Sequence, residues 1–224
     1  MTGLLALIGG GEFQPGCEFD TDLLAASGGD DVAVLATGFA YENPAKAIAA
    51  ATAWFEALGA RAEEIPVYTR TDAMVSENVD AVARARFVYL VGTSPMHLRS
   101  VLKDTPLFDA LVAAWRDGAV LAGSGAGADV LCDPMVDTRG GAFTVGLGIV
   151  PDLAVIPRAD QWSPDKVRRT VELAPLDLVL VSLPERSGIV RNPDGRWSTV
   201  GDGLVTVHRG DANASLDDLP TATI

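Results

Sequence analysis

The chain has 224 residues, 48% of them hydrophobic, which is enough to form one large α/β domain with its own core. Its net charge of −13 at pH 7 gives a surface that repels phosphate backbones and anionic membranes, so neither nucleic acid nor a membrane is an expected partner. The longest apolar runs are strand-sized and are interrupted by Gly or charged residues, so we predict no bilayer-spanning segment.

Strand and helix patterns alternate through the first half of the chain. Short apolar runs that end at turn residues predict strands at 4–8, 32–37, 62–67, 87–91 and 119–122. Residues with helical periodicity between them predict helices at 20–26, 44–58, 72–85, 96–102 and 106–116. Continuous apolar strands separated by helices indicate a mainly parallel sheet that is covered by helices on both faces.

The predicted elements become shorter after residue 131. Apolar runs predict strands at 142–145, 154–156, 178–183, 188–191, 196–200 and 204–208. The strong turn Asn192-Pro193-Asp194-Gly195 joins two of these strands into a small C-terminal β-hairpin. From Gly210 the chain is polar and rich in Asp. We therefore predict a single domain over residues 1–209, followed by a loose polar tail over residues 210–224.

Residues 120–131, with the sequence VLAGSGAGADVL, have the pattern of a sharp strand–turn–helix joint. Such a joint, called a nucleophile elbow, presents one side chain at the tip of a strained turn, and its neighbours must be small because the backbones are crowded. In the pattern G-x-Nuc-x-G the tip falls on Gly125, which has no side chain to attack a substrate. The segment therefore predicts the backbone of an acyl-transfer site without its nucleophile.

Three glycine-containing strand ends are expected to meet at the carboxyl edge of the sheet, where open parallel sheets bind ligands. They are Gly9-Gly10-Gly11 followed by Glu12, Gly92-Thr93-Ser94, and Gly123–Gly127. Backbone N–H groups in such turns can hold an oxyanion or a phosphate, although tight packing alone would also explain the glycines.

The sequence carries no cofactor or metal motif. A dinucleotide fingerprint that begins at Gly9 would need Gly where Gln14 stands, and the P-loop pattern is absent. Cys17 and Cys132 fit neither a metal nor a redox motif, and we predict that they are reduced thiols in a cytoplasmic protein. No cofactor and no metal are therefore expected.

Five segments, in this order, resemble the cyanophycinase and alpha-aspartyl dipeptidase family of serine peptidases. They are IGGGE at 8–12, VGTS at 91–94, GSGAGA at 123–128, GGAFTVGLGIVP at 140–151 and LPERSGIV at 183–190. That family is related in fold to the class I glutamine amidotransferases. The resemblance extends from about residue 4 to residue 208, and it implies a flavodoxin-like α/β fold with a Ser-His-Glu/Asp site and an oxyanion hole of backbone amides.

The resemblance implies a role for each matching position, and two of the three catalytic residues are replaced. The nucleophile position is Gly125, and the position of the base is Arg158, whose guanidinium is always protonated and cannot accept a proton. The acid is retained as Glu185. The oxyanion amides would come from Ala126 and from the turn at Gly92-Thr93, and Gly10, Gly11, Glu12 and Ser124 are further candidates to line the ligand site.

Three hypotheses about the function are open. In the first, the chain is a non-catalytic homologue whose pocket binds a small acidic or amide-bearing ligand or serves as a partner surface. In the second, Glu12, Glu185, Asp160 or Arg158 supports a changed chemistry, such as a biosynthetic tailoring step. In the third, a displaced nucleophile such as Ser124, helped by His97, retains hydrolase activity. His208 is expected to be structural, and a homodimer is the default for this fold. A neighbouring Glu185 would give Arg158 a charge-assisted partner, and such a pair would make hydrolysis very unlikely.

Overall fold

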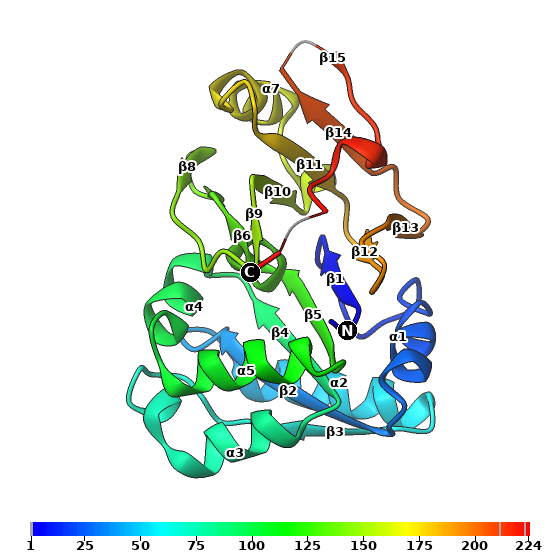
Figure 1. Ribbon diagram of the computed structural model, residues 1–224, viewed down its shortest axis with the longest axis vertical. Helices are drawn as coiled ribbons and strands as arrows, with labels where there is room; N and C mark the ends of the chain where they lie inside the picture. The colour runs from blue at the N-terminus through cyan, green and yellow to red at the C-terminus, as the bar shows by residue number, and fades with distance from the viewer. Residues whose placement is uncertain (1, 211, 222) are drawn as a thin grey trace.

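The computed structural model describes residues 2–210, 212–221 and 223–224, and it has an α/β fold built on two main sheets (Figure 1). The larger sheet has the strand order β13-β12-β1-β5-β4-β2-β3. Five of its strands are parallel, and β12 and β13 are antiparallel additions at one edge. Its strands are β1 (Leu5–Ile8), β2 (Asp31–Gly38), β3 (Arg61–Glu64), β4 (Phe87–Gly92), β5 (Val120–Gly125), β12 (Ser187–Arg191) and β13 (Trp197–Gly201).

Helices cover both faces of this sheet, as predicted. Alternate residues of β1 point to opposite faces, so Leu5 and Leu7 join one core cluster while Ala6 and Ile8 join the other. The first cluster packs under α3, α4, α5 and α6, and the second under α1 and α2. These helices are α1 (Asp20–Ser27), α2 (Pro44–Ala57), α3 (Ser76–Arg84), α4 (Pro95–Leu102), α5 (Pro106–Arg116) and α6 (Ala126–Leu131).

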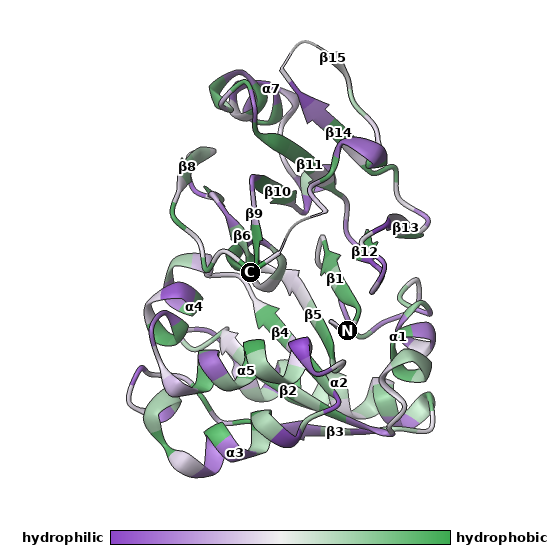
Figure 2. Cartoon of the chain, viewed as in Figure 1, coloured by the Kyte–Doolittle hydropathy of each residue, from purple (hydrophilic) through white to green (hydrophobic). Residues whose placement is uncertain are grey.

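A second sheet, in the order β15-β14-β11-β10-β6-β9, lies beyond the carboxyl ends of the central strands (Figure 1). Its hydrophobic strands β10 and β11 contrast with the hydrophilic β14 in Figure 2. The strands are β6 (Cys132–Asp133), β9 (Val150–Pro151), β10 (Leu153–Pro157), β11 (Val179–Leu183), β14 (Thr206–Arg209) and β15 (Ala212–Asn213). A separate pair, β7 (Met135–Asp137) and β8 (Ala142–Thr144), lies beside this sheet. Together the two sheets and their helices confirm the predicted fold class.

The helices of the structure differ from the predicted ones at two places. The helix predicted over 72–85 is divided at Val75 into the 3-10 helix η1 (Asp72–Met74) and α3. The helix α7 (Pro164–Leu173) was not predicted, although Ser163 accepts a hydrogen bond from the Lys166 N–H as its N-cap and Pro164 occupies its first position.

The C-terminal segment is not a loose tail over its described residues. Backbone pairing joins β15 to β14, and the 3-10 helix η3 (Leu216–Asp218) follows. Leu219 is only 3% exposed, and the Trp197 Nε1–H donates to the Pro220 carbonyl at 2.9 Å. Apolar burial and this bond hold the segment against the domain, which its polar composition did not suggest. Among the described residues, no helix is both long enough and apolar enough to cross a membrane.

Candidate functional site

The joint between β5 and α6 has the strained backbone that an elbow requires. Gly125 has φ 58° and ψ −117°, a combination outside the regions that L-residues ordinarily occupy. Gly92 lies directly opposite Gly125 in the parallel pair β4–β5. A Cβ added at Gly125 would lie 2.8 Å from the Gly92 carbonyl oxygen. The turn therefore lies where the sequence predicted it. Its backbone conformation and its close contact with Gly92 favour glycine over a residue with a side chain.

A small cavity of about 90 Å³ adjoins this turn. Five predicted site residues come together in its lining: Gly92, Thr93, Gly125, Ala126 and Arg158. The remaining lining residues, Thr138, Pro157 and Trp162, were not predicted. Thr138 lies between β7 and β8, and Trp162 follows the 3-10 helix η2 (Ala159–Gln161). Their approach to the elbow depends on the packing of the second sheet, for which residue spacing gives no signal.

Arg158 forms an ion pair with Glu185. The Arg158 Nε lies 3.4 Å from Oε1 of Glu185, and the two side chains are 37% and 26% exposed. Arg158 has φ 52°, and its backbone N–H donates to the Gly9 carbonyl at 2.8 Å. A Cβ added at Gly10 would be only 2.7 Å from the Arg158 Nε, so the absence of a side chain at Gly10 makes room for the guanidinium. A permanent cation thus occupies the predicted position of the base.

The two predicted oxyanion donors differ in their contacts. Ala126 is the first residue of α6, so its N–H is among the four that a helix leaves without an intrahelical acceptor. The Thr93 N–H instead donates to the Gly38 carbonyl at 3.2 Å, as the Ser94 N–H also does. The Thr93 hydroxyl donates to Glu42. The turn at Gly92-Thr93 therefore reaches the cavity, but the Thr93 N–H already has an acceptor.

Ser124 and His97 hydrogen-bond to different partners. Ser124 is fully buried, and its hydroxyl donates to Oε2 of Glu12 at 2.7 Å, toward the first glycine-rich turn. The His97 Nε2 lies 2.9 Å from the Tyr68 carbonyl oxygen, and its ring packs edge-on against Tyr41. These contacts do not assemble the serine–histidine pair that a displaced nucleophile at Ser124 would use.

The cysteines do not offer a replacement nucleophile. The Cys17 thiol lies 3.3 Å from the Gly11 carbonyl oxygen, and burial, with nearby Asp20, raises the pKa of Cys17 to about 12. Burial also raises the pKa of Cys132 well above its usual value. Because the thiolate is the reactive form, both thiols are unreactive near neutral pH. The described residues contain no group of three His, Cys, Asp or Glu side chains placed to hold a metal ion.

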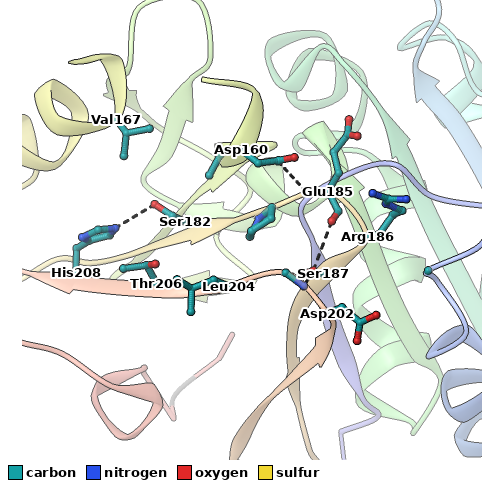
Figure 3. Close-up of a pocket in the computed structure, with 14 residues that line it drawn as sticks. Asp160, Val167, Ser182, Glu185, Arg186, Ser187, Asp202, Leu204, Thr206 and His208 are labelled. Carbon is teal, nitrogen blue, oxygen red and sulfur yellow. Dashed lines mark hydrogen bonds between the residues drawn. The ribbon is translucent and has the colours of Figure 1, made fainter. Parts of the chain in front are cut away.

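A second and larger cavity, of about 710 Å³, has Glu185 in its lining (Figure 3). Glu185 lines this larger cavity, whereas Arg158 lines the elbow cavity. At its far end the Ser182 hydroxyl and the His208 Nε2 are 3.0 Å apart, as the dashed line in Figure 3 marks. Ser182 was not predicted as a site residue, because one Ser within an apolar strand gives no signal of its partner 26 residues away.

Comparisons with known proteins agree with this architecture. The model of peptidase family S51 matches residues 5–177. A cyanophycinase of Synechococcus elongatus is 27% identical over an alignment 225 positions long, which covers 92% of this chain and 67% of that protein. A cyanophycinase of Nostoc sp. is 30% identical over an alignment 172 positions long, which covers 68% of this chain and 55% of that protein. The chain thus spans only about half to two thirds of the length of these relatives.

Two solved structures share the fold. The crystal structure of a peptidase from an acI-B1 actinobacterium superposes with a TM-score of 0.84 and 29% identity, over 94% of this chain and 92% of that chain. That of a proposed peptidase E protein from Listeria monocytogenes EGD-e gives a TM-score of 0.64 at 16% identity, over 93% of this chain and 99% of that chain. The second likeness concerns the fold alone. With the family match over most of its length, this chain belongs to peptidase family S51.

Proposed function

We propose that this chain is a member of peptidase family S51 that binds a small acidic or amide-bearing ligand at the elbow without cleaving it. The observation that carries the proposal is Gly125 at the tip of the turn, with the Gly92 carbonyl oxygen close to where a nucleophile's Cβ would lie. Loss of catalytic residues from a serine hydrolase site typically lowers its rate by several orders of magnitude, and the remainder comes from binding and the oxyanion hole.

Arg158 supports both parts of the proposal. It stands in the position of the base but cannot accept a proton, and its charge suits a carboxylate or an amide oxygen. Its Nε is 3.4 Å from Glu185, a separation too long for a strong charge-assisted hydrogen bond, so an incoming anion can compete for the guanidinium. The elbow cavity of about 90 Å³ is small, so it would hold one carboxylate or amide group while the rest of the ligand lies outside.

Thermal shift measurements with alpha-aspartyl dipeptides and with simple amides test the binding. A ligand at 100 times its dissociation constant should stabilise the folded protein by ~2.7 kcal/mol. We expect Arg158→Ala to abolish the shift, and Arg61→Ala, which removes an exposed arginine paired with Asp31 at 2.8 Å, to leave it unchanged. The proposal fails if none of these compounds stabilises the wild-type protein, or if Arg158→Ala binds them as well as the wild type does.

A further inference from the structure

The larger cavity contains a serine–histidine pair that the proposed function does not use. Ser182 lies on β11 and His208 on β14, and both side chains line the cavity (Figure 3). The distance of 3.0 Å between the Ser182 Oγ and the His208 Nε2 is within the range at which a base takes a proton from a nucleophile. Ser182 is 7% exposed, so its hydroxyl has little contact with solvent other than through the cavity.

The antiparallel register of β11 and β14 brings a third polar side chain to the same wall. Ser182 stands directly opposite Thr206, and His208 lies two residues farther along β14. Residues two apart on a strand face the same side of a sheet, so Thr206 and His208 share the face that carries Ser182. All three residues line the cavity, and Thr206 is exposed at its open side.

Each side chain is suited to one part of an acyl-transfer reaction. Burial lowers the pKa of His208, which keeps its imidazole neutral near pH 7 and able to accept a proton. The Ser182 hydroxyl is the nucleophile that such a base activates. The Thr206 hydroxyl can donate a hydrogen bond to an oxyanion, as side-chain hydroxyls do in some oxyanion holes.

We propose that Ser182, His208 and Thr206 form a second site, separate from the elbow, that hydrolyses small esters. The Ser182 Oγ attacks the acyl carbon while its proton passes to the His208 Nε2, and Thr206 donates to the developing oxyanion. The ester C–O bond then breaks, and His208 returns the proton to the departing alcohol. Water cleaves the acyl–Ser182 bond by the same proton transfers, so the products are one alcohol and one carboxylic acid.

The lining of the cavity limits the substrate. A volume of about 710 Å³ accommodates a small organic molecule. The carboxylates of Asp160, Glu185 and Asp202 outnumber the single cation Arg186 among the charged lining residues. Negative potential disfavours anionic acyl groups, so the substrate is an uncharged or cationic ester. This class differs from the acidic ligand of the elbow, and the inference holds whether or not the elbow binds that ligand.

A fluorophosphonate probe followed by peptide mass spectrometry tests the assignment in the wild-type protein. We expect modification of Ser182 and, with 4-nitrophenyl butyrate, a slow release of nitrophenol that Ser182→Ala abolishes. His208→Gln should lower that rate about 100-fold or more, because general-base catalysis typically contributes 10²–10⁴-fold. Thr206→Val should lower it about 100-fold, the usual loss for one oxyanion donor.

The chain offers matched controls for both substitutions. It contains only two histidines, and His97 contacts Tyr41 and the Tyr68 carbonyl, so His97→Gln should retain the wild-type rate. Ser100→Ala, on the exposed side of α4, should do the same. The inference is overturned if the probe modifies another serine or none, or if folded His208→Gln reacts as fast as the wild type. Because labelling of the wild-type protein needs no variant, the test stands even if a substituted protein does not fold.

Discussion

Gly125 determines what the elbow can do, because its backbone conformation and its missing side chain act together. Its φ of 58° with ψ −117° is costly for a residue that carries a Cβ. In an ordinary nucleophile elbow, the same strained turn exposes the side chain of the nucleophile. Here the strained turn remains, while the Gly92 carbonyl oxygen lies 2.8 Å from where a Cβ would be placed.

Replacing Gly125 with Ser should therefore destabilise the fold. We expect the free energy of unfolding to fall by about 1–3 kcal/mol, the usual cost of one non-glycine residue in such a conformation. Urea denaturation measures this change. Gly140→Ser is the matched control, since a Cβ at Gly140 meets nothing within 4 Å. Equal stability of Gly125→Ser and the wild type would show that the turn is not strained in this way.

Among single residues, the sequence predicted those fixed by local pattern. Gly125 and Ala126 follow from the elbow motif, and the resemblance pointed to the positions of Arg158 and Glu185, which the structure brings together. Thr138, Trp162 and Ser182 were not foreseen, because their places at the cavities result from long-range packing. The hydrogen bond from the Thr93 N–H to the Gly38 carbonyl could likewise not be predicted from the sequence, since it forms between the ends of two parallel strands.

At the scale of elements, the contact between α1 and α2 contains a buried carboxyl group. Asp20, the first residue of α1, is 0% exposed, and its Oδ2 accepts a hydrogen bond from the Trp54 Nε1–H of α2 at 2.9 Å. Its Oδ1 has no partner among the described residues. Burial raises the pKa of Asp20 to about 7. The folded protein therefore holds this proton over a pH range in which the unfolded chain has released it.

The stability contributed by Asp20 should decrease as the pH rises. Its pKa is raised on folding, so the contribution is fully present below pH ~4 and is lost as the pH rises to about 7, by roughly 4 kcal/mol in total. Asp20→Asn, which can still accept from Trp54, should show a weaker loss between pH 5 and pH 8 in urea denaturation. Asp22→Asn, an exposed position on α1, should behave like the wild type. Identical pH dependence of Asp20→Asn and the wild type would refute this assignment.

Elements with a strong local pattern were predicted well, and those that depend on distant contacts were not. The parallel strands β1, β2, β4 and β5 are continuous apolar runs, so periodicity and length located them. The pairings β6–β9 and β14–β15 each join only two pairs of residues, which is too short for a residue pattern to predict. By contrast, Ser163-Pro164 is a recognisable N-terminal signal for the helix α7. The helix was not predicted, because the surrounding segments suggested strands.

For the molecule as a whole, the two partners of one ion pair line two different cavities. The elbow cavity adjoins the joint of β5 and α6, and the larger cavity lies against β11 and β14. Arg158 lines the elbow cavity, and its partner Glu185 lines the larger cavity. The family and the fold could be predicted from the sequence, because several motifs in a fixed order carry the resemblance to the family. The division into two cavities could not be predicted from the sequence, since it depends on how the second sheet is placed relative to the first.

We expect that the elbow of this chain does not catalyse peptide hydrolysis, because Gly125 at its tip offers no nucleophile. The most direct measurement is the release of aspartate from alpha-aspartyl dipeptides by the wild-type protein, followed by mass spectrometry over days. We expect a rate about a millionfold below that of a serine peptidase with an intact triad, the loss typical when such a triad is removed. Multiple turnovers per minute, in proportion to protein concentration, would contradict it.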